Sequence, residues 1–332
     1  MTAASLPTLE DVLNRAHVVA LPMRVPFRGI RHRELVVIDG PAGWGEFAPF
    51  LEYAAPEASR WLASALESSY AVWPRPLRPE VAINATVPAV GPAQVPAILA
   101  RFPGVATVKV KVAEAGQELR DDLDRVAAVR EVMGPAARIR IDANGAWSLA
   151  QATAALGRLA AYGLDYVEQP CASVTDLARL RVDLARAGVA VRIAADESIR
   201  KAEDPALVAR LEAADLIVVK VAPLGGVARA LEIVAECGLP AVVSSALDSS
   251  VGISAGVALA AALPALDGAC GLGTLALMDG DISPEPMIAR GGILTPRRVT
   301  ADPELLARFA AAPEVAAAWQ ARVRAAYAVL AG

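Results

Sequence analysis

Short apolar segments recur along the chain from Val81 onward, and this repeat limits the possible folds more than any other feature of the sequence. Their starting points are separated by about 24 to 33 residues, the length of a strand, a helix and two short loops. The intervening stretches, such as 119–133, 149–161 and 175–187, have helical periodicity. Eight strands with seven helical connections predict an α/β fold, a (β/α)7β modified TIM barrel, and a doubly wound open sheet is the alternative. The expected strands are 81–87, 105–112, 138–142, 164–168, 191–196, 215–221, 240–245 and about 266–271.

The first 80 residues lack this repeat. Short strands are expected at 18–21 and 34–38, joined by an arginine-rich loop at 24–33. The segment 43–50 is rich in glycine and aromatic residues and is too irregular for a strand pair, so it predicts a loop that lines a pocket. These features predict a small α+β unit.

Residues 290–332 predict a helical tail that could pack back on this first unit. We therefore expect two domains. One is an α+β capping domain of residues 1–80, completed by the tail at 290–332. The other is the (β/α)7β barrel domain of residues 81–289, which we expect to carry the catalytic site.

Composition excludes several classes of protein. The 332 residues carry a formal net charge of -4, which gives no basic footprint for nucleic acid. The N-terminus lacks the pattern of a secretory signal, and the most apolar stretch, 251–266, contains Pro264 and is too short to span a bilayer. The cysteines, Cys171, Cys237 and Cys270, are isolated and lack metal-binding spacing. We expect a cytoplasmic protein that binds neither nucleic acid nor membrane; its oligomeric state is open, with a monomer plausible.

Lysine is rare in this chain, and its positions are informative. Of 32 Lys and Arg residues only four are Lys, at 109, 111, 201 and 220. Lys109 and Lys111 alternate along one expected strand, so both point to the same face. Arginine cannot lose its proton in a protein, whereas a desolvated lysine can. The pair therefore predicts an amine that transfers protons, and a solvated edge strand is the simpler alternative.

Ionisable residues also end the next barrel strands. Asp142, Glu168 and Asp196 close the third, fourth and fifth strands, and Lys220 closes the sixth. Barrel active sites lie at this end of the strands, although single acidic residues there can also be helix caps. Three converging carboxylates would repel one another without a cation. They predict an oxygen cage for a hard divalent ion, Mg²⁺ with Mn²⁺ as a substitute.

These motifs together resemble a known family. The pattern of the two lysines, Asp142-Ala143-Asn144, Glu168-Gln169-Pro170, Asp196-Glu197-Ser198 and Lys220 is similar to the muconate-lactonizing branch of the enolase superfamily. The segments 22–29, 44–50 and 244–250 resemble those of the actinobacterial o-succinylbenzoate synthases, which act in menaquinone biosynthesis.

The resemblance implies a mechanism. The reaction is a syn dehydration of 2-succinyl-6-hydroxy-2,4-cyclohexadiene-1-carboxylate, a small anionic substrate, to o-succinylbenzoate. Asp142, Glu168 and Asp196 would hold Mg²⁺. Lys111 would remove the proton and return it to the departing hydroxyl, Lys109 would lower the pKa of Lys111, and Lys220 would stay cationic on the opposite wall. The expected substrate contacts are Ser244, Ser245, Arg24, Arg28 and Asn144, with the helix start near 249–250 as an anion site.

Other functions stay open at this point. Lys111 and Lys220 on opposite faces form a two-base pair, which suits an N-acylamino acid racemase or a dipeptide epimerase. Against an epimerase, the expected eighth strand reads Cys270 to Thr274 without the acidic pair that the resembling dipeptide epimerases use. A muconate-type cycloisomerase is a third possibility. A non-catalytic barrel that only binds a ligand would predict a broken lysine or carboxylate set, and the set is complete.

Overall fold

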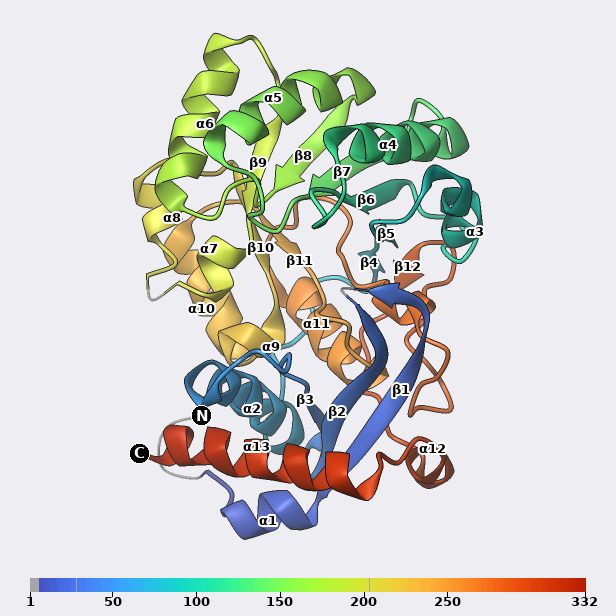
Figure 1. Ribbon diagram of the computed structural model, residues 1–332. Coiled ribbons are helices and arrows are strands. Elements are labelled where there is room, and N and C mark those ends of the chain that lie inside the picture. Colours follow the sequence, from blue (N-terminus) through green and yellow to red (C-terminus); the bar gives the residue numbers. More distant parts are fainter. Residues whose placement is uncertain (1–5, 28, 203) are drawn as a thin grey trace.

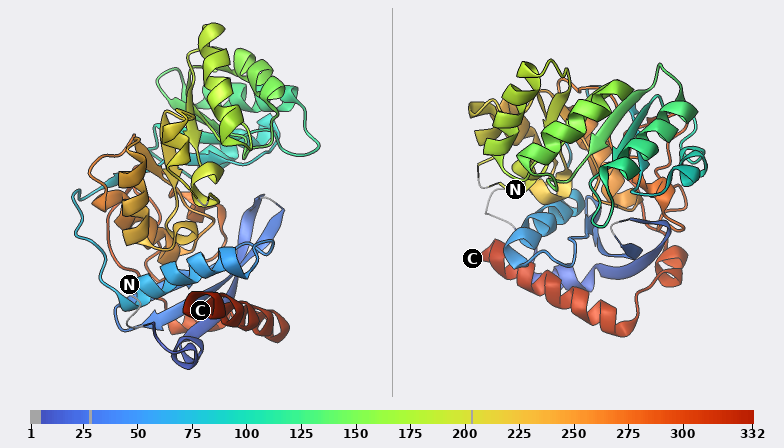
Figure 2. Two further views of the ribbon diagram at one scale, coloured as in Figure 1. Left: turned by 90° about the vertical axis from the view of Figure 1, so that its left-hand side faces the viewer. Right: turned by 45° about the horizontal axis from the view of Figure 1, so that its top comes forward.

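The computed structural model describes residues 6–27, 29–202 and 204–332. Its N-terminal part is an antiparallel sheet in the order β1-β2-β3, preceded by the short helix α1. Helix α2 packs on this sheet, and the C-terminal helix α13 packs along α2 at the same end of the molecule (Figures 1 and 2). The bounds are α1 Leu9–Asn14, β1 Ala16–Phe27, β2 Ile30–Gly40, β3 Gly43–Phe47, α2 Ala55–Tyr70, α12 Pro303–Arg308 and α13 Pro313–Ala331.

Two expectations for this region were wrong. Most of the expected loop at 24–33 belongs to β1 and β2, which extend far beyond the short strands predicted. The segment from Gly43 to Phe47 is the strand β3, not a loop. Its glycines serve close packing: a Cβ atom on Gly45 would lie 1.9 Å from the carbonyl oxygen of Ala65 in α2. Figure 1 shows α2 beside β3.

The rest of the chain forms a curled parallel sheet, which confirms the predicted α/β barrel class. Strands β5 to β11 pair in sequence order, each with its neighbours, and helices lie in the connections. The strands are β4 Val81–Ala82, β5 Ala85–Val87, β6 Thr107–Lys111, β7 Arg138–Asp142, β8 Leu164–Glu168, β9 Arg192–Ala195, β10 Leu216–Val219 and β11 Ala241–Val243. The helices are η1 Pro92–Gln94, α3 Val95–Leu99, α4 Leu119–Met133, α5 Leu149–Leu159, η2 Ala160–Tyr162, α6 Val174–Arg186, α7 Glu197–Arg200, α8 Leu207–Arg210, α9 Val221–Leu224, α10 Val227–Cys237 and α11 Ser250–Ala262.

The expected eighth strand is only a pair of bridging residues. The amide of Cys270 donates to Ala82 O at 2.7 Å on one side, and the amide of Gly271 donates to Val243 O at 2.8 Å on the other. The segment therefore joins the two edges of the parallel sheet. A Cβ on Gly271 would lie 2.5 Å from Ser244 Oγ, so a larger residue here would require the Ser244 side chain to move. The helix η3 Thr274–Leu277 and the strand β12 Ile293–Leu294, which pairs with β4, follow.

The alternation of side chains along the strands positions the candidate site. Along each strand, every second side chain packs in the main core. The side chains between them point into the barrel, where they form a separate cluster that includes Tyr166, Ala194 and Val218. Moving two residues along each strand keeps the side chain on the same face. Glu168, Asp196 and Lys220 therefore form the next layer, at the carboxyl ends of the strands.

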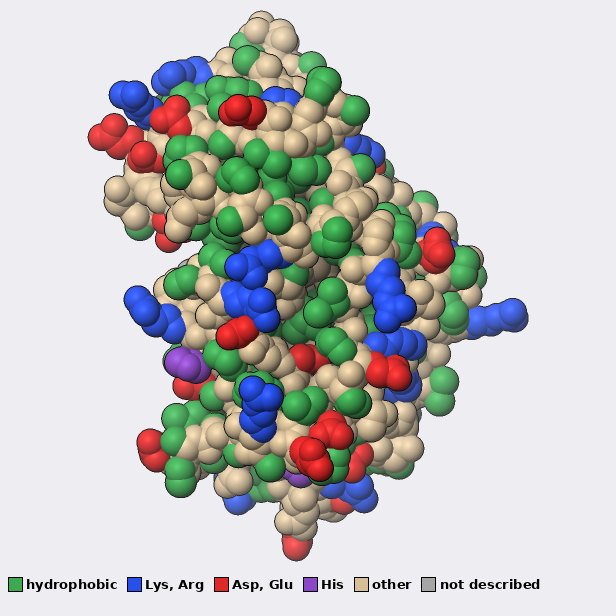
Figure 3. All heavy atoms as spheres, turned by 90° about the vertical axis from the view of Figure 1, so that its right-hand side faces the viewer, with side chains coloured by type: hydrophobic (Ala, Val, Ile, Leu, Met, Phe, Trp, Pro, Cys, Tyr) green, Lys and Arg blue, Asp and Glu red, His purple; other side chains and the backbone are tan. Residues whose placement is uncertain are grey.

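The capping sheet and α2 lie against α9 and α11 of the barrel, while α4, α5 and α6 lie at the far end of the molecule (Figure 2). On the face shown in Figure 3, basic and acidic side chains are interspersed with hydrophobic ones. Among the helices of the described segments, none is long and apolar enough to cross a membrane. The division at residues 80 and 289 stays a prediction.

Candidate active site

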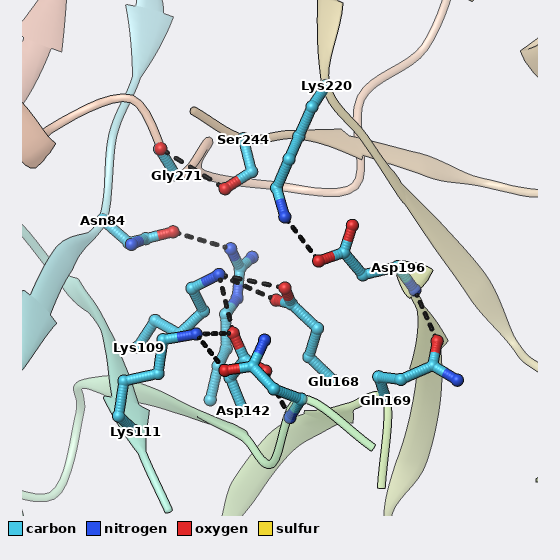
Figure 4. Close-up of polar contacts among 12 residues, drawn as sticks. Asn84, Lys109, Lys111, Asp142, Glu168, Gln169, Asp196, Lys220, Ser244 and Gly271 are labelled. Carbon is cyan, nitrogen blue, oxygen red and sulfur yellow. Dashed lines mark hydrogen bonds and ion pairs between the residues drawn. The ribbon is translucent and has the colours of Figure 1, made fainter. Parts of the chain in front are cut away.

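Six ionisable side chains converge at the carboxyl ends of five consecutive strands (Figure 4). Each comes from the barrel-facing parity of its strand, or from the residue directly after that strand. They are Lys109 and Lys111 from β6, Asp142 from β7, Glu168 from β8, Asp196 after β9 and Lys220 after β10. The structure therefore brings together the lysines and carboxylates that the sequence pattern places at one barrel mouth.

Lys109 lies between two carboxylates. Its Nζ atom is 3.0 Å and 3.1 Å from the two oxygens of Glu168 and 3.3 Å from Oδ2 of Asp142. The Glu168 side chain is 0% exposed, so the ammonium compensates a carboxylate that has no access to water. Lys109 is thus held in a charged network at the base of the site.

The other two lysines pair with carboxylates of this cluster from different walls. Lys111 pairs with Oδ2 of Asp142 and donates to Oδ1 of Asn144 at 2.7 Å. Lys220 pairs with Oδ2 of Asp196. In Figure 4 these two ammonium groups approach the cluster from opposite sides, as expected for strands on opposite walls of a barrel. This is the arrangement that both a one-base and a two-base reaction need.

Burial and charge shift the pKa values of the cluster in opposite directions. Burial raises the pKa of Glu168, and Asp142 adds to this effect. Burial alone would also raise the pKa of Asp142, but Lys111 and Lys109 outweigh it and lower that pKa. For Asp196, Lys220 and Arg200 outweigh burial and lower the pKa to about 2. The pKa of Lys109 is raised, because Glu168 and Asp142 outweigh its burial.

The three carboxylates have the chemistry of a site for a hard divalent ion. They are anionic oxygen donors, each no more than 1% exposed, from three successive strands. Within the described segments, no three acidic, His or Cys side chains are close enough to share an ion as they stand. In Figure 4 the ammonium groups of Lys109, Lys111 and Lys220 contact the carboxylate oxygens. A divalent ion would compete with these lysines for the same oxygens, and the ligand set stays a prediction.

A cavity that is partly open to solvent lies over this cluster and is lined by both parts of the chain. Phe50 and Trp61 come from the N-terminal part, and Ser244 to Leu247 come from the loop after β11. Aromatic walls on one side and charged groups on the other suit a small ring that carries carboxylates.

The expected substrate contacts differ in their placement. Ser244 and Ser245 line the cavity, where the Ser245 hydroxyl bonds Gly271 O at 2.8 Å. Asn144 contacts Lys111. Arg24 is not among the residues lining this cavity; it pairs with Asp279 on the side of the capping sheet. Arg28 lies outside the described residues.

The backbone amides at the start of helix α11 are already bound by acidic side chains of the protein. Glu46 of β3 accepts hydrogen bonds from the Ser249 amide at 3.1 Å and the Gly252 amide at 3.2 Å, and Asp281 accepts one from the Ser250 amide at 3.0 Å. Since two carboxylates of the protein satisfy these amides, this helix start does not offer a substrate anion free donors.

The sequence predicts that the segment 43–50 lines a pocket, and its Phe50 does so, but the sequence gives no signal for Arg33. Arg33 of β2 is buried and donates to the carbonyls of Ala48, Ala246 and Leu247, so it holds the loop after β11 against the capping sheet. No local pattern signals this role, because these partners are about 15 and 214 residues away. Arg200 had a local signal, since it lies four residues after Asp196 in a helical turn.

Comparison with known families gives two matches. Residues 97–300 match the family described as Enolase C-terminal domain-like, and residues 18–69 match the family described as Enolase N-terminal domain-like. The chain is 55% identical over 326 residues to an o-succinylbenzoate synthase of Mycobacterium tuberculosis, covering 98% of this chain and 97% of the relative. It is 58% identical over 315 residues to an o-succinylbenzoate synthase of Mycolicibacterium smegmatis, covering 95% of each.

Solved structures show the same fold. A muconate lactonizing enzyme from Pseudomonas fluorescens, complexed with muconolactone, is similar with a TM-score of 0.76 and 22% identity, covering 90% of this chain and 98% of that chain. A dipeptide epimerase from Enterococcus faecalis is similar with a TM-score of 0.69 and 20% identity, covering 86% and 97%. At these sequence identities the similarity shows a shared fold and nothing further.

Proposed function

The chain belongs to the o-succinylbenzoate synthase family of the enolase superfamily, and we propose that it dehydrates 2-succinyl-6-hydroxy-2,4-cyclohexadiene-1-carboxylate to o-succinylbenzoate with Mg²⁺ as cofactor. It is an enzyme of the lyase class that acts on a small molecule. One observation carries the chemical part of the proposal: Lys111 and Lys220 approach a single cavity from opposite walls, directly beside three buried carboxylates. The step would belong to menaquinone biosynthesis.

Lys111 is the proposed base. It lies at the end of β6 and lines the cavity, and Asp142 and Asn144 hold its Nζ atom. Its amine takes the proton α to the ring carboxylate, and the same ammonium then gives that proton to the departing hydroxyl, which leaves as water. Both transfers occur on one face, which gives the syn course. The electron pair of the broken C–H bond forms the last double bond of the aromatic ring.

Asp142, Glu168 and Asp196 are the proposed ligands of Mg²⁺. When bound, the ion would stabilise the negative charge that develops on the substrate carboxylate. Lys220 is held by Asp196 on the opposite wall and would stay cationic there, where it stabilises the anionic ring electrostatically. The ammonium group of Lys109 would compensate the negative charge of Glu168 at the base of the site.

The cavity walls suit the two parts of this substrate. Phe50 and Trp61 present aromatic surface toward which the ring can pack. Ser244 and Ser245 line the same cavity and are the proposed contacts of the succinyl group. Asn144 acts indirectly, through its hydrogen bond with Lys111.

A racemase is the second candidate, because two lysines on opposite walls could exchange an α proton between the faces of an N-acylamino acid. The segment from Cys270 to Thr274, which closes the barrel, carries no acidic residue to receive an ammonium group. This absence argues against a free amino terminus on the substrate, as dipeptide epimerization would require, but leaves N-succinylamino acids as candidates.

An ultraviolet assay of o-succinylbenzoate formation tests the proposal. The wild-type protein should form product with Mg²⁺ and stop when EDTA is added. Glu168→Gln removes one anionic ligand, and we expect it to lose most Mg²⁺ affinity and turnover while staying folded, since the site is at the barrel mouth. Glu131→Gln, on the exposed face of α4, is the matched control and should match the wild type. Wild-type metal titration and turnover in Glu168→Gln would remove Glu168 from the ligand set.

A further inference from the structure

Arg200 lies between the carboxylate cluster and the segment that follows β3. It is the last residue of α7, directly after the strand that positions Asp196, and its side chain is 4% exposed. Its guanidinium donates from Nε to Asp196 Oδ1 at 3.2 Å, from Nη2 to Glu197 Oε1 at 2.5 Å and from Nη1 to Tyr53 Oη at 3.0 Å. Each nitrogen therefore binds a different residue, and one of these belongs to the N-terminal part.

Tyr53 connects this arginine to the wall of the cavity. Its ring packs edge-on against Phe50 at a centroid distance of 5.7 Å and lies 6.0 Å from the ring of Trp61. Phe50 and Trp61 both line the cavity over the carboxylates, as does Arg200 itself. A second contact joins the same parts, because Arg60 of α2 donates to the backbone oxygen of Arg200 at 3.4 Å. Arg200 is thus joined to the segment 50–54 through Tyr53 and to α2 through Arg60.

We propose that Arg200 is a positioning residue that couples metal binding at Asp196 to the placement of the capping loop 50–54. The inference rests on the proposed function, because Asp196 is a proposed ligand. Arg200 fixes Oδ1 of Asp196 and leaves Oδ2 on the side where Lys220 pairs with it. Tyr53 fixes the guanidinium in turn, which prevents it from rotating to take both oxygens of the carboxylate. Loop placement and metal affinity then depend on each other reciprocally.

Tyr53→Phe tests this coupling, because it removes one hydroxyl and leaves the aromatic wall intact. We expect the Mg²⁺ affinity measured by calorimetry to fall about fivefold or more, in the usual range of coupling between sites. Tyr70→Phe is the matched control: its hydroxyl also forms a hydrogen bond with a charged side chain, donating to Asp11 at 2.5 Å, but within the N-terminal part. Hydrogen exchange of residues 50–54 should slow on addition of Mg²⁺ in the wild type and in Tyr70→Phe, and not in Tyr53→Phe.

A purely structural role for Tyr53 would lower the unfolding temperature and leave the Mg²⁺ affinity of the folded protein unchanged, which would overturn the inference. An equal loss of affinity in Tyr70→Phe would also overturn it. Arg200→Lys keeps the charge but loses the three-way geometry, and it replaces Tyr53→Phe if that variant fails to fold. A wild type that dehydrates its substrate, with unchanged metal affinity in the variants, refutes the coupling alone. A wild type that neither binds Mg²⁺ nor dehydrates refutes the proposed function, and the coupling falls with it.

Discussion

Replacing Lys109 with Met tests the idea that the ammonium groups and a divalent ion compensate the same carboxylates. In the structure, Lys109 contacts both oxygens of Glu168, whose side chain is 0% exposed. Methionine has a similar volume and no charge, so the variant leaves a buried carboxylate without its compensating cation. Removing one partner of a buried ion pair costs about 3 to 5 kcal/mol of unfolding free energy.

The loss should depend on pH and on metal. Burial raises the pKa of Glu168 even beside Lys109, and without the ammonium that pKa rises further. A carboxyl group whose folded-state pKa lies above its unfolded value lowers the unfolding free energy as pH rises between these two values. In the wild type this fall ends near the Glu168 pKa of about 7, whereas in the variant it continues, so the loss should grow from about pH 7 to pH 8. Mg²⁺ at 100 times its dissociation constant stabilises a folded protein by about 2.7 kcal/mol. The stabilisation by Mg²⁺ should be larger in the variant, because no ammonium group at position 109 competes with the ion for the carboxylate oxygens.

Urea unfolding followed by tryptophan fluorescence at pH 8, with EDTA or with saturating Mg²⁺, measures both effects. Lys201→Met is the control, since Lys201 is exposed and lies outside the carboxylate cluster. The wild type and Lys109→Met should differ by about 3 to 5 kcal/mol in EDTA and by clearly less in Mg²⁺. The reasoning would be refuted if Mg²⁺ did not reduce the difference in unfolding free energy between the wild type and Lys109→Met. It would also be refuted if Lys109→Met lost no more unfolding free energy than Lys201→Met.

Two further predictions concern the contacts of the N-terminal part with the barrel. Arg33→Met leaves the carbonyls that Arg33 binds without donors, so it should lower the unfolding free energy by about 3 kcal/mol or more in urea titrations. Arg31→Met, at an exposed position of the same strand, should change the unfolding free energy little. Equal losses in the two variants would contradict the role of Arg33. Burial, with Asp248 adding to it, raises the pKa of Glu46 to about 8. Since this folded-state pKa is above the unfolded value, the wild type should lose stability relative to Glu46→Gln as pH rises from 5 to 8, and a stability difference that stays constant over this range would contradict the assignment.

The repeat and the alternation within strands were sufficient to predict the barrel and the convergence of six charged side chains at its mouth. Each strand contributes its functional side chain at a fixed parity and at the same end, so local sequence carries the information. This is why Lys109, Asp142 and Glu168 are predictable as neighbours although they are far apart in the chain.

The N-terminal part was less predictable, for physical reasons. Strand β1 contains Pro22 and Pro26, which predict a break, but β1 lies at one end of the sheet order β1-β2-β3 and its register shifts between Pro22 and Phe27. The glycines of β3 predict a loop, whereas Gly45 lies in a strand and lets α2 approach. Arg33 acts on carbonyls more than 200 residues away, so only the folded chain shows what it binds.

The most direct test of the account compares dehydration with α-proton exchange across three lysine variants. If Lys111 makes both proton transfers, Lys111→Arg should abolish dehydration, because arginine cannot act as a base near neutral pH. Lys220→Arg keeps the positive charge and should retain measurably more dehydration than Lys220→Ala. Dehydration is followed by ultraviolet absorbance, and exchange is followed with N-succinylamino acids in deuterium oxide. A wild type that rapidly exchanges the α proton of both N-succinylamino acid enantiomers, yet does not dehydrate the cyclohexadiene substrate, would contradict the lyase assignment.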